Sequence, residues 1–290
     1  MKFEECIIRL GFTENERAIL TDIHKKCDEK EFSEELARAR EEYDKGDEAF
    51  GEYISAFSEK SGVYVNTLNL YVYLRFVEET YAEYRRRGIS DEMFLKTLSG
   101  LVSVSRPVSK EVKEFGIPQN VFRSWYRLAL DCKLFSPGGL LFEIFEAPCD
   151  IEVDGKSVGK GDSCISVHIL RGAKLDDETC EALYAFARGF FKKHFDMDNI
   201  IFICKSWLIH PWLCEVLPDT SSIVNFQKKF KIIYVEDDLS GLSWIFGSGA
   251  GSAKALEKIE DYPENTSLQR AAKKRLLEGK KLGLGLGARI

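Results

Sequence analysis

Apolar residues recur at helical spacing along the first ~130 residues of the chain. The longest such stretch, Val63–Arg87, places Leu70, Tyr73 and Leu74 on one broad face. It ends in Arg-Arg-Arg-Gly, and cations followed by glycine are typical of a helix C-terminus. The pattern predicts helices over Glu14–Glu29, Ser33–Lys45, Glu48–Ser58, Val63–Arg87, a segment that opens at Ser90, and Gln119–Cys132.

The pattern changes near Leu134, where short strand-like segments separated by turn residues begin. Residues 140–148 are strand-like, and residues 149–169 have the pattern of strand, turn and strand. Asp154 and Gly155 form one turn signal, and Gly159-Lys-Gly161 forms another. The tail, residues 280–290, alternates Leu and Gly and predicts a strand whose glycines let another backbone approach closely.

The segment Ser163–Phe230 carries strands and helices in alternation. The predicted order is a strand at Cys164–Ile169, a helix at Glu178–His194, a strand at Asn199–Trp207, a short helical piece ending at Pro218, and a strand at Asn225–Val235. Such alternation packs helices against a sheet. We therefore predict an α+β protein, with an all-helical N-terminal domain at residues 1–132 and a mixed α/β domain with a central, mostly antiparallel sheet at residues 133–290.

Composition narrows the possible functions. The chain has 290 residues, of which 44% are hydrophobic and 30% are charged, as in an ordinary globular protein. Its formal net charge of -6 argues against a nucleic-acid partner, because such proteins carry clustered basic residues. No apolar run approaches the ~20 residues of a membrane span. The N-terminus also lacks the pattern of a signal peptide, so we expect no membrane partner.

The spacing of the cysteines bears on two questions, whether the protein binds a metal and where in the cell it is located. Eight cysteines are scattered along the chain, with no CxxC pair and no Cys/His spacing of a zinc site. We therefore expect reduced thiols, no metal and a cytoplasmic location.

The first candidate for chemistry is the loop Leu170–Leu175, between a predicted strand and a predicted helix. It supplies Arg171, Gly172 and Lys174 next to a helix N-terminus. The first amides of a helix are unpaired and favour anions, so this loop is a candidate pyrophosphate cradle. An ordinary strand-to-helix connection with surface cations is the alternative.

The second candidate is His168, which shares one face of its predicted strand with Ser166 because side chains alternate along a strand. A histidine at the C-terminal end of a strand can act as a base near neutral pH. A structural histidine that is hydrogen-bonded at the strand end is the alternative.

Cys204 and Ser206 share a face at the end of the next predicted strand. If the two strands are neighbours, either side chain could lie near His168. It could then protonate a departing thiolate or act as a nucleophile paired with the histidine. For Cys204, a buried free thiol is the alternative.

A further pair, Asn225 and Gln227, opens the third predicted strand of the segment. Two residues apart on a strand, their amides share a face and could hold a substrate carbonyl or amide. Ordinary cross-strand hydrogen bonding is the alternative.

Taken together, the motifs resemble those of one protein family. The strand end SVHI, the helix end KKHF, the strand end CKSW, the segment SSIVNFQKKF and the TSLQRA helix with its Gly-alternating tail are the residues that carry the resemblance. They are similar to bacterial acyltransferases that pair a helical N-acyltransferase N-terminal domain with a GNAT-like C-terminal domain. The resemblance implies that residues 133–290 adopt a GNAT-like fold, in which an acyl-CoA lies where two central strands separate.

The resemblance also implies roles for particular residues. The cofactor-binding positions are Val167, Ile169, Arg171, Gly172, Ala173 and Lys174. The catalytic positions are His168, Ser206 and Cys204, and the substrate-binding positions are Trp207, Asn225 and Gln227. Ala173 stands where the family usually has a second glycine.

We therefore predict an acyltransferase that moves an acyl group from acyl-CoA to an amine of a small-molecule or peptide acceptor by direct attack, without a metal. His168 removes the amine proton, and Ser206 or Cys204 protonates the departing thiolate. One alternative is a non-catalytic GNAT-like binding or regulatory module, which the altered loop favours. The other is a hydrolase that uses Cys204 and His168.

Overall fold

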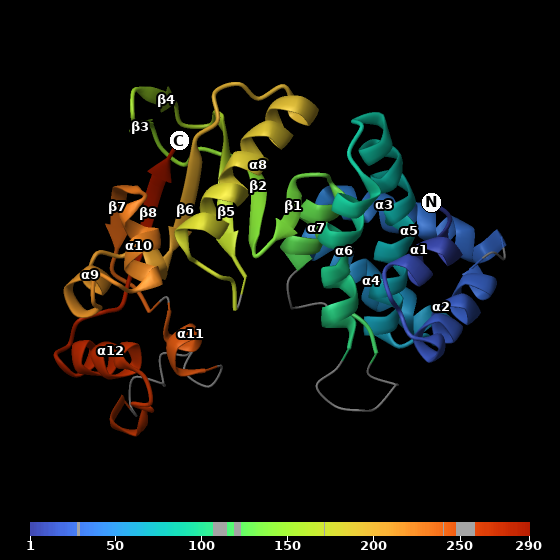
Figure 1. The fold of residues 1–290 in the computed structure, drawn as a ribbon. Coiled ribbons are helices and arrows are strands. Elements are labelled where there is room, and N and C mark those ends of the chain that lie inside the picture. Colours follow the sequence, from blue (N-terminus) through green and yellow to red (C-terminus); the bar gives the residue numbers. More distant parts are fainter. Residues whose placement is uncertain (28–29, 107–114, 119–122, 171, 240, 248–258) are drawn as a thin grey trace. The chain divides into compact units, whose positions relative to one another are not determined.

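The computed structural model describes residues 1–27, 30–106, 115–118, 123–170, 172–239, 241–247 and 259–290. It divides into two compact units, Met1–Pro137 and Gly138–Ile290 (Figure 1). The first unit is mostly helical, and the second contains a mixed sheet with helices. Within the described ranges, no helix combines the length and the apolar character needed to cross a membrane.

Helices build the N-terminal unit. They are α1 (Phe3–Arg9), α2 (Glu14–Cys27), α3 (Lys30–Lys45), α4 (Asp47–Ser61), α5 (Val65–Arg86), α6 (Asp91–Ser105) and α7 (Arg123–Leu130). The long helix α5 packs against α1, α2, α4, α6 and α7, and its residues from Thr67 to Leu74 are all buried. A helix buried on all sides forms the centre of a core. The predicted helices of this unit are confirmed over the described residues; residues 28–29 of the predicted Glu14–Glu29 helix and 119–122 of the last one lie outside them.

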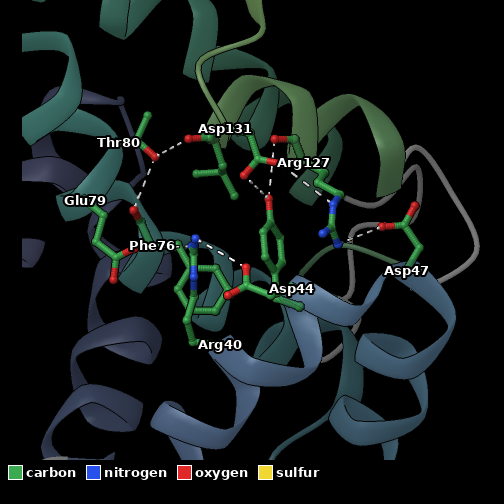
Figure 2. Close-up of polar contacts among 10 residues, drawn as sticks. Arg40, Asp44, Asp47, Phe76, Glu79, Thr80, Arg127 and Asp131 are labelled. Carbon is green, nitrogen blue, oxygen red and sulfur yellow. Dashed lines mark hydrogen bonds and ion pairs between the residues drawn. The ribbon is translucent and has the colours of Figure 1, made fainter.

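Polar contacts fix α7 against α3 and α4 (Figure 2). The Tyr43 hydroxyl on α3 donates to Asp131 Oδ1 at 3.0 Å. The Arg127 guanidinium on α7 lies 4.1 Å from the centre of the Tyr43 ring, and its Nη1 lies 3.5 Å from Asp47 Oδ1. Because Tyr43 is buried, its hydroxyl needs such an acceptor, and the contact fixes the position of α7.

The sheet has six strands in the order β1-β2-β5-β6-β8-β7, and all of them except β1, which spans the boundary at Pro137, belong to the C-terminal unit. Their bounds are β1 (Leu134–Gly138), β2 (Leu140–Glu146), β5 (Ser163–Ile169), β6 (Phe202–Ser206), β7 (Lys231–Glu236) and β8 (Leu284–Arg289). The pairs β2–β5, β6–β8 and β7–β8 are antiparallel, and β5–β6 is parallel. This mostly antiparallel, mixed sheet confirms the predicted fold class.

The strands β3 (Ile151–Val153) and β4 (Lys156–Val158) form a separate hairpin. Asp154 and Gly155 connect them with positive φ angles of 48° and 77°. Two consecutive positive φ angles are the geometry of a tight hairpin turn, as the Asp-Gly signal predicts. Residues of this hairpin share a buried cluster with Ile203 of β6.

Helix α8 (Asp177–Phe195) covers the opposite face of the sheet. The ring of its Tyr184 lies 5.9 Å from the Phe142 ring on β2 and 4.9 Å from the Phe202 ring on β6. This arrangement confirms the amphipathic helix predicted at Glu178–His194. The two faces of the sheet therefore differ, since α8 lies on one and the β3–β4 hairpin on the other.

Short helices surround the far end of the sheet, near β7 and β8. They are the 3₁₀ helix η2 (Trp207–Ile209), α9 (Trp212–Val216), α10 (Ser222–Lys228), α11 (Leu242–Phe246) and α12 (Ser267–Leu277). At the start of α12, Thr266 and Gln269 form a reciprocal capping box, which satisfies two backbone amides of the helix end.

The tail prediction is confirmed at β8. A Cβ added to Gly285 would lie 2.9 Å from the backbone oxygen of Ile209, and one added to Gly287 would lie 2.9 Å from Phe230 Cβ. Only glycine leaves room for η2 and Phe230 to approach the strand this closely.

The predicted strand at Asn225–Val235 is wrong over its first part. Ser222–Lys228 forms α10, and the strand β7 begins at Lys231. The alternation of polar and apolar residues there is compatible with a strand, but the short helix α10 also buries Val224 and Phe226. Since short apolar patterns do not separate helix from strand, tertiary packing decides.

Candidate functional site

The parallel strands β5 and β6 pair over only part of their length. The register joins Ile165 with Phe202 and Ser166 with Ile203. Beyond these pairs, β5 continues along β2 to its end, and β6 continues along β8 to its end. The two central strands therefore separate toward their C-terminal ends, and a gap in the hydrogen-bond ladder opens between them.

One edge of this gap is the backbone of β5. The Ile165 N–H donates to the Ile201 oxygen at 3.0 Å, toward β6. Because backbone groups alternate in direction along a strand, Val167 and Ile169 direct their polar backbone groups toward the same edge. Ile169 lies beyond the last pair of the β5–β6 ladder. The edge can therefore offer backbone hydrogen bonds to a bound molecule.

Beside the gap lies an acid–histidine pair. Glu143 on β2 is directly opposite Ser166 on β5, and His168 is two residues further along β5. Glu143 Oε2 lies 2.6 Å from His168 Nε2, and the Ser166 hydroxyl oxygen lies 3.4 Å from the same nitrogen. The Glu143 side chain is 9% exposed and the His168 side chain 28%. A ligand can thus reach the ring while the carboxylate behind it is buried.

Sequence reasoning missed Glu143. The residue stands in the strand-like segment LLFEIFE, where alternation places it on the same face as Leu141 and Phe145. A carboxylate on an otherwise apolar face was the available signal, because buried carboxylates need partners. Its pairing with His168 depends on the β2–β5 register, which the sequence does not contain.

Cys204 and Ser206 lie on the other face of the sheet from His168. The strands are neighbours, as predicted, but the parallel register aligns Ser166 with Ile203. Side chains that are aligned in this way share a face, so His168 and Ile203 lie on one side. By the same alternation, Cys204 lies on the side covered by α8. Beside the gap, His168 therefore lies on one face of the sheet, and Cys204 and Ser206 lie on the other.

The Cys204 thiol is 1% exposed, and burial raises its pKa to about 12. A thiol in this environment is not a ready nucleophile, since the thiolate is the reactive form. The Ser206 hydroxyl accepts a hydrogen bond from the Leu208 N–H at 3.2 Å and so caps η2. Trp207 follows it and packs beside Gly241, where an added Cβ would lie 3.0 Å from the indole.

The loop after β5 is described except for Arg171, which lies outside the described residues. Gly172 has a φ of 79°, in the left-handed region that glycine favours, and the Ala173 N–H donates to the Leu170 oxygen at 3.0 Å. Lys174 is exposed. Among the described residues of the loop, the cation Lys174 therefore faces solvent.

The N-terminus of α8 is already capped by the chain itself. The Thr179 N–H donates to Asp176 Oδ1 at 2.9 Å, and these contacts with Thr179 lower the pKa of Asp176. An anion at this helix end would compete with the capping carboxylate.

Gln227 and Asn225 lie on α10, so they do not share a strand face as predicted. The Gln227 amide nitrogen donates to the oxygens of Leu208 and His210 at 3.1 and 2.7 Å, and its carbonyl accepts from the Cys214 thiol. Gln227 therefore fastens the connection after β6 to α10. Asn225 is half-buried on the same helix.

Among the described residues, no group of three or more His, Cys, Asp and Glu side chains is arranged to hold a metal ion. The groups that line the site are the acid–histidine pair, the strand edge and the hydroxyls of Ser166 and Ser206.

A mixed sheet whose two central parallel strands separate is the arrangement of a GNAT-like domain. The chain belongs to the family of the GNAT-like C-terminal domain, whose family model matches residues 134–288. The family model of the N-acyltransferase N-terminal domain matches residues 1–132. No curated protein matches the chain.

The structure is similar to solved structures of an acyltransferase. One, in complex with decanoyl-CoA and teicoplanin, is 20% identical with a TM-score of 0.60, and the match covers 100% of this chain and 99% of that chain. One in complex with CoA and 10C-teicoplanin gives the same values. One in complex with decanoyl-CoA has a TM-score of 0.59 and 20% identity, covering 79% of this chain and 67% of that chain. At this identity the likeness concerns the fold.

Proposed function

We propose that the protein transfers an acyl group from acyl-CoA to an amine of a small-molecule or peptide acceptor. The observation that carries this proposal is the separation of β5 and β6 beside His168, because it exposes a strand edge next to a histidine that can move a proton. The similar acyltransferases bound to decanoyl-CoA and to teicoplanin support an acyl-CoA donor and a small-molecule acceptor.

In the proposed reaction, the neutral amine nitrogen attacks the thioester carbonyl carbon. The new C–N bond forms, the C–S bond breaks, and CoA leaves as a thiolate. His168 accepts the proton that the nitrogen loses. The backbone N–H of Ile169, at the open edge of β5, is placed to polarise the carbonyl oxygen while charge develops on it.

The departing thiolate needs a proton. Ser206 is the better candidate, because its hydroxyl oxygen accepts from the Leu208 N–H and its own proton can still be donated. Cys204 is only 1% exposed, whereas Ser206 is half-buried at the strand end, so the hydroxyl is the group that a leaving thiolate can reach. Ser206 and Cys204 approach the gap from the α8 side, and His168 approaches it from the other side. We propose that donor and acceptor enter the gap from these two sides.

We place the enzyme in the cytoplasm. The support is that the described cysteines are free thiols, as is usual where the environment keeps thiols reduced.

The test is the substitution His168→Ala, assayed with decanoyl-CoA and a panel of amines. We expect kcat to fall by about 10²- to 10⁴-fold, the range that general bases supply, with an unchanged circular dichroism spectrum. His194→Ala, on α8, is the matched control and should leave kcat unchanged. Unchanged turnover in His168→Ala would remove His168 from the mechanism.

A non-catalytic GNAT-like binding or regulatory module is the second candidate function. It is favoured by the capped N-terminus of α8, where Asp176 occupies the Thr179 amide, and by Ala173 in the adjacent loop. Calorimetric titration with acetyl-CoA and decanoyl-CoA separates the candidates. Binding of neither acyl-CoA supports the module, and binding together with turnover of an amine supports the enzyme.

A further inference from the structure

We infer that Glu143 is a positioning residue that keeps the His168 proton on Nε2, so that Nδ1 is the atom that accepts the proton of the acceptor amine. The role of Nδ1 in the reaction rests on the proposed function, whereas the position of the ring proton does not. The inference starts from the contact between Glu143 Oε2 and His168 Nε2 at 2.6 Å.

The chemistry of the two groups assigns the proton. A carboxylate only accepts hydrogen bonds, whereas each nitrogen of a neutral imidazole either donates or accepts. The short contact with the carboxylate therefore requires the hydrogen on Nε2. The same neutral ring then carries its lone pair on Nδ1. The Ser166 hydroxyl oxygen also lies 3.4 Å from Nε2, so two side chains of the protein contact that nitrogen.

The environment of Glu143 makes this contact strong. The residue is 7% exposed, and a buried carboxylate is costly unless it is paired. Among the described residues, His168 is the one ring or cation that the carboxylate contacts within 4.0 Å. The pairing therefore orients the ring as well as its proton.

The register of the sheet supports the geometry. Glu143 is opposite Ser166, and His168 is diagonal to it, so both contacts come from the pairing of two regular strands. A pair held by strands is more precisely placed than a pair on loops. His168 is the more exposed member, so the ring can meet a ligand while Glu143 stays behind it.

The first test is nitrogen NMR of the resting protein, without substrates. A protein labelled with ¹⁵N-histidine has four histidine rings, and His168→Gln identifies the signals of His168. We expect the Nε2–H form to dominate in the wild-type protein and this preference to be reduced in Glu143→Gln. A dominant Nδ1–H form in the wild-type protein would overturn the inference, and this measurement needs no activity.

The second test is kinetic. Glu143→Gln keeps the size of the side chain but removes its charge, so we expect kcat to fall about 100-fold with little change in KM for acyl-CoA. Glu146→Gln, an exposed residue on the same strand, is the matched control and should keep the wild-type kcat. Wild-type kcat in Glu143→Gln would overturn the positioning role. If His168→Ala retains full turnover while NMR finds the Nε2–H form, the proposed mechanism fails and the assignment of the ring proton stands.

Discussion

Gly287 on β8 lies directly opposite Cys204 on β6, with the side chains of Ile209 and Phe230 packed against the glycine. A Cβ added to Gly287 would lie 2.9 Å from both Ile209 Cγ2 and Phe230 Cβ. Such contacts are too short for carbon atoms, so η2 and Phe230 can lie this close to the sheet only because β8 carries glycine at this position.

Gly287→Ala should therefore destabilise the C-terminal unit by about 1–3 kcal/mol, the usual cost of overpacking a core. Urea unfolding measures the loss. The matched control is Gly189→Ala on α8, where an added Cβ meets nothing within 4 Å. Because alanine is the better helix former, this change should stabilise by up to about 1 kcal/mol. Equal stability of Gly287→Ala and the wild-type protein would contradict the packing argument.

Cys204 should react slowly with thiol reagents. Burial leaves it 1% exposed and raises its pKa to about 12, whereas Cys214 is exposed. In the native protein near pH 7, iodoacetamide should label Cys214 well before Cys204, because alkylation needs an accessible thiolate. Mass spectrometry of the peptides measures the order, and urea-unfolded protein is the control in which both react. Early labelling of Cys204 would favour the alternative of a Cys–His hydrolase, which the opposite sheet faces of Cys204 and His168 disfavour.

His210 should make the protein less stable in mild acid. Burial, aided by the charge of Arg275, lowers its pKa below the ordinary 6.5, and its Nδ1 accepts the Trp212 N–H at 3.3 Å. The unfolded chain therefore binds a proton that the folded chain resists. Stability is fully present above 6.5 and declines as pH falls below it, by at most about 1.4 kcal/mol per pH unit.

Thermal unfolding from pH ~8 to ~5 measures this effect. His210→Asn should flatten the slope, since the variant has no ring to protonate. A slope in His210→Asn as steep as in the wild-type protein would assign the acid sensitivity to other groups.

Elements with a long or strongly marked pattern could be predicted from the sequence. The helix at Glu178–His194 forms because its apolar residues recur at helical spacing, and the hairpin at Asp154–Gly155 forms because those two residues tolerate positive φ. The tail strand was predictable from its alternating glycines. In each case local sequence and tertiary packing favour the same structure.

The parts that could not be predicted depend on register. Alternation placed Cys204 and Ser206 on one face of a strand, but whether that face is the one with His168 depends on which residue of β5 lies beside Ile203. The partnership of Glu143 with His168 has the same origin. Asn225 and Gln227 lie on a helix and do not form the expected strand pair. The buried Gln227 amide donates instead to the backbone oxygens of Leu208 and His210. Local sequence patterns do not determine strand register or the long-range contacts that follow from it.

The position of β8 between β6 and β7 has a consequence for the order of synthesis (Figure 1). The ribosome makes β6 and β7 well before residues 284–289, yet neither strand has its antiparallel partner until those residues emerge. One side of β6 thus has no strand partner until β8 has been made. Folding that depends on contacts between residues distant in the sequence is slow. The wall of the gap formed by β6 is therefore completed only after β8 has been synthesised.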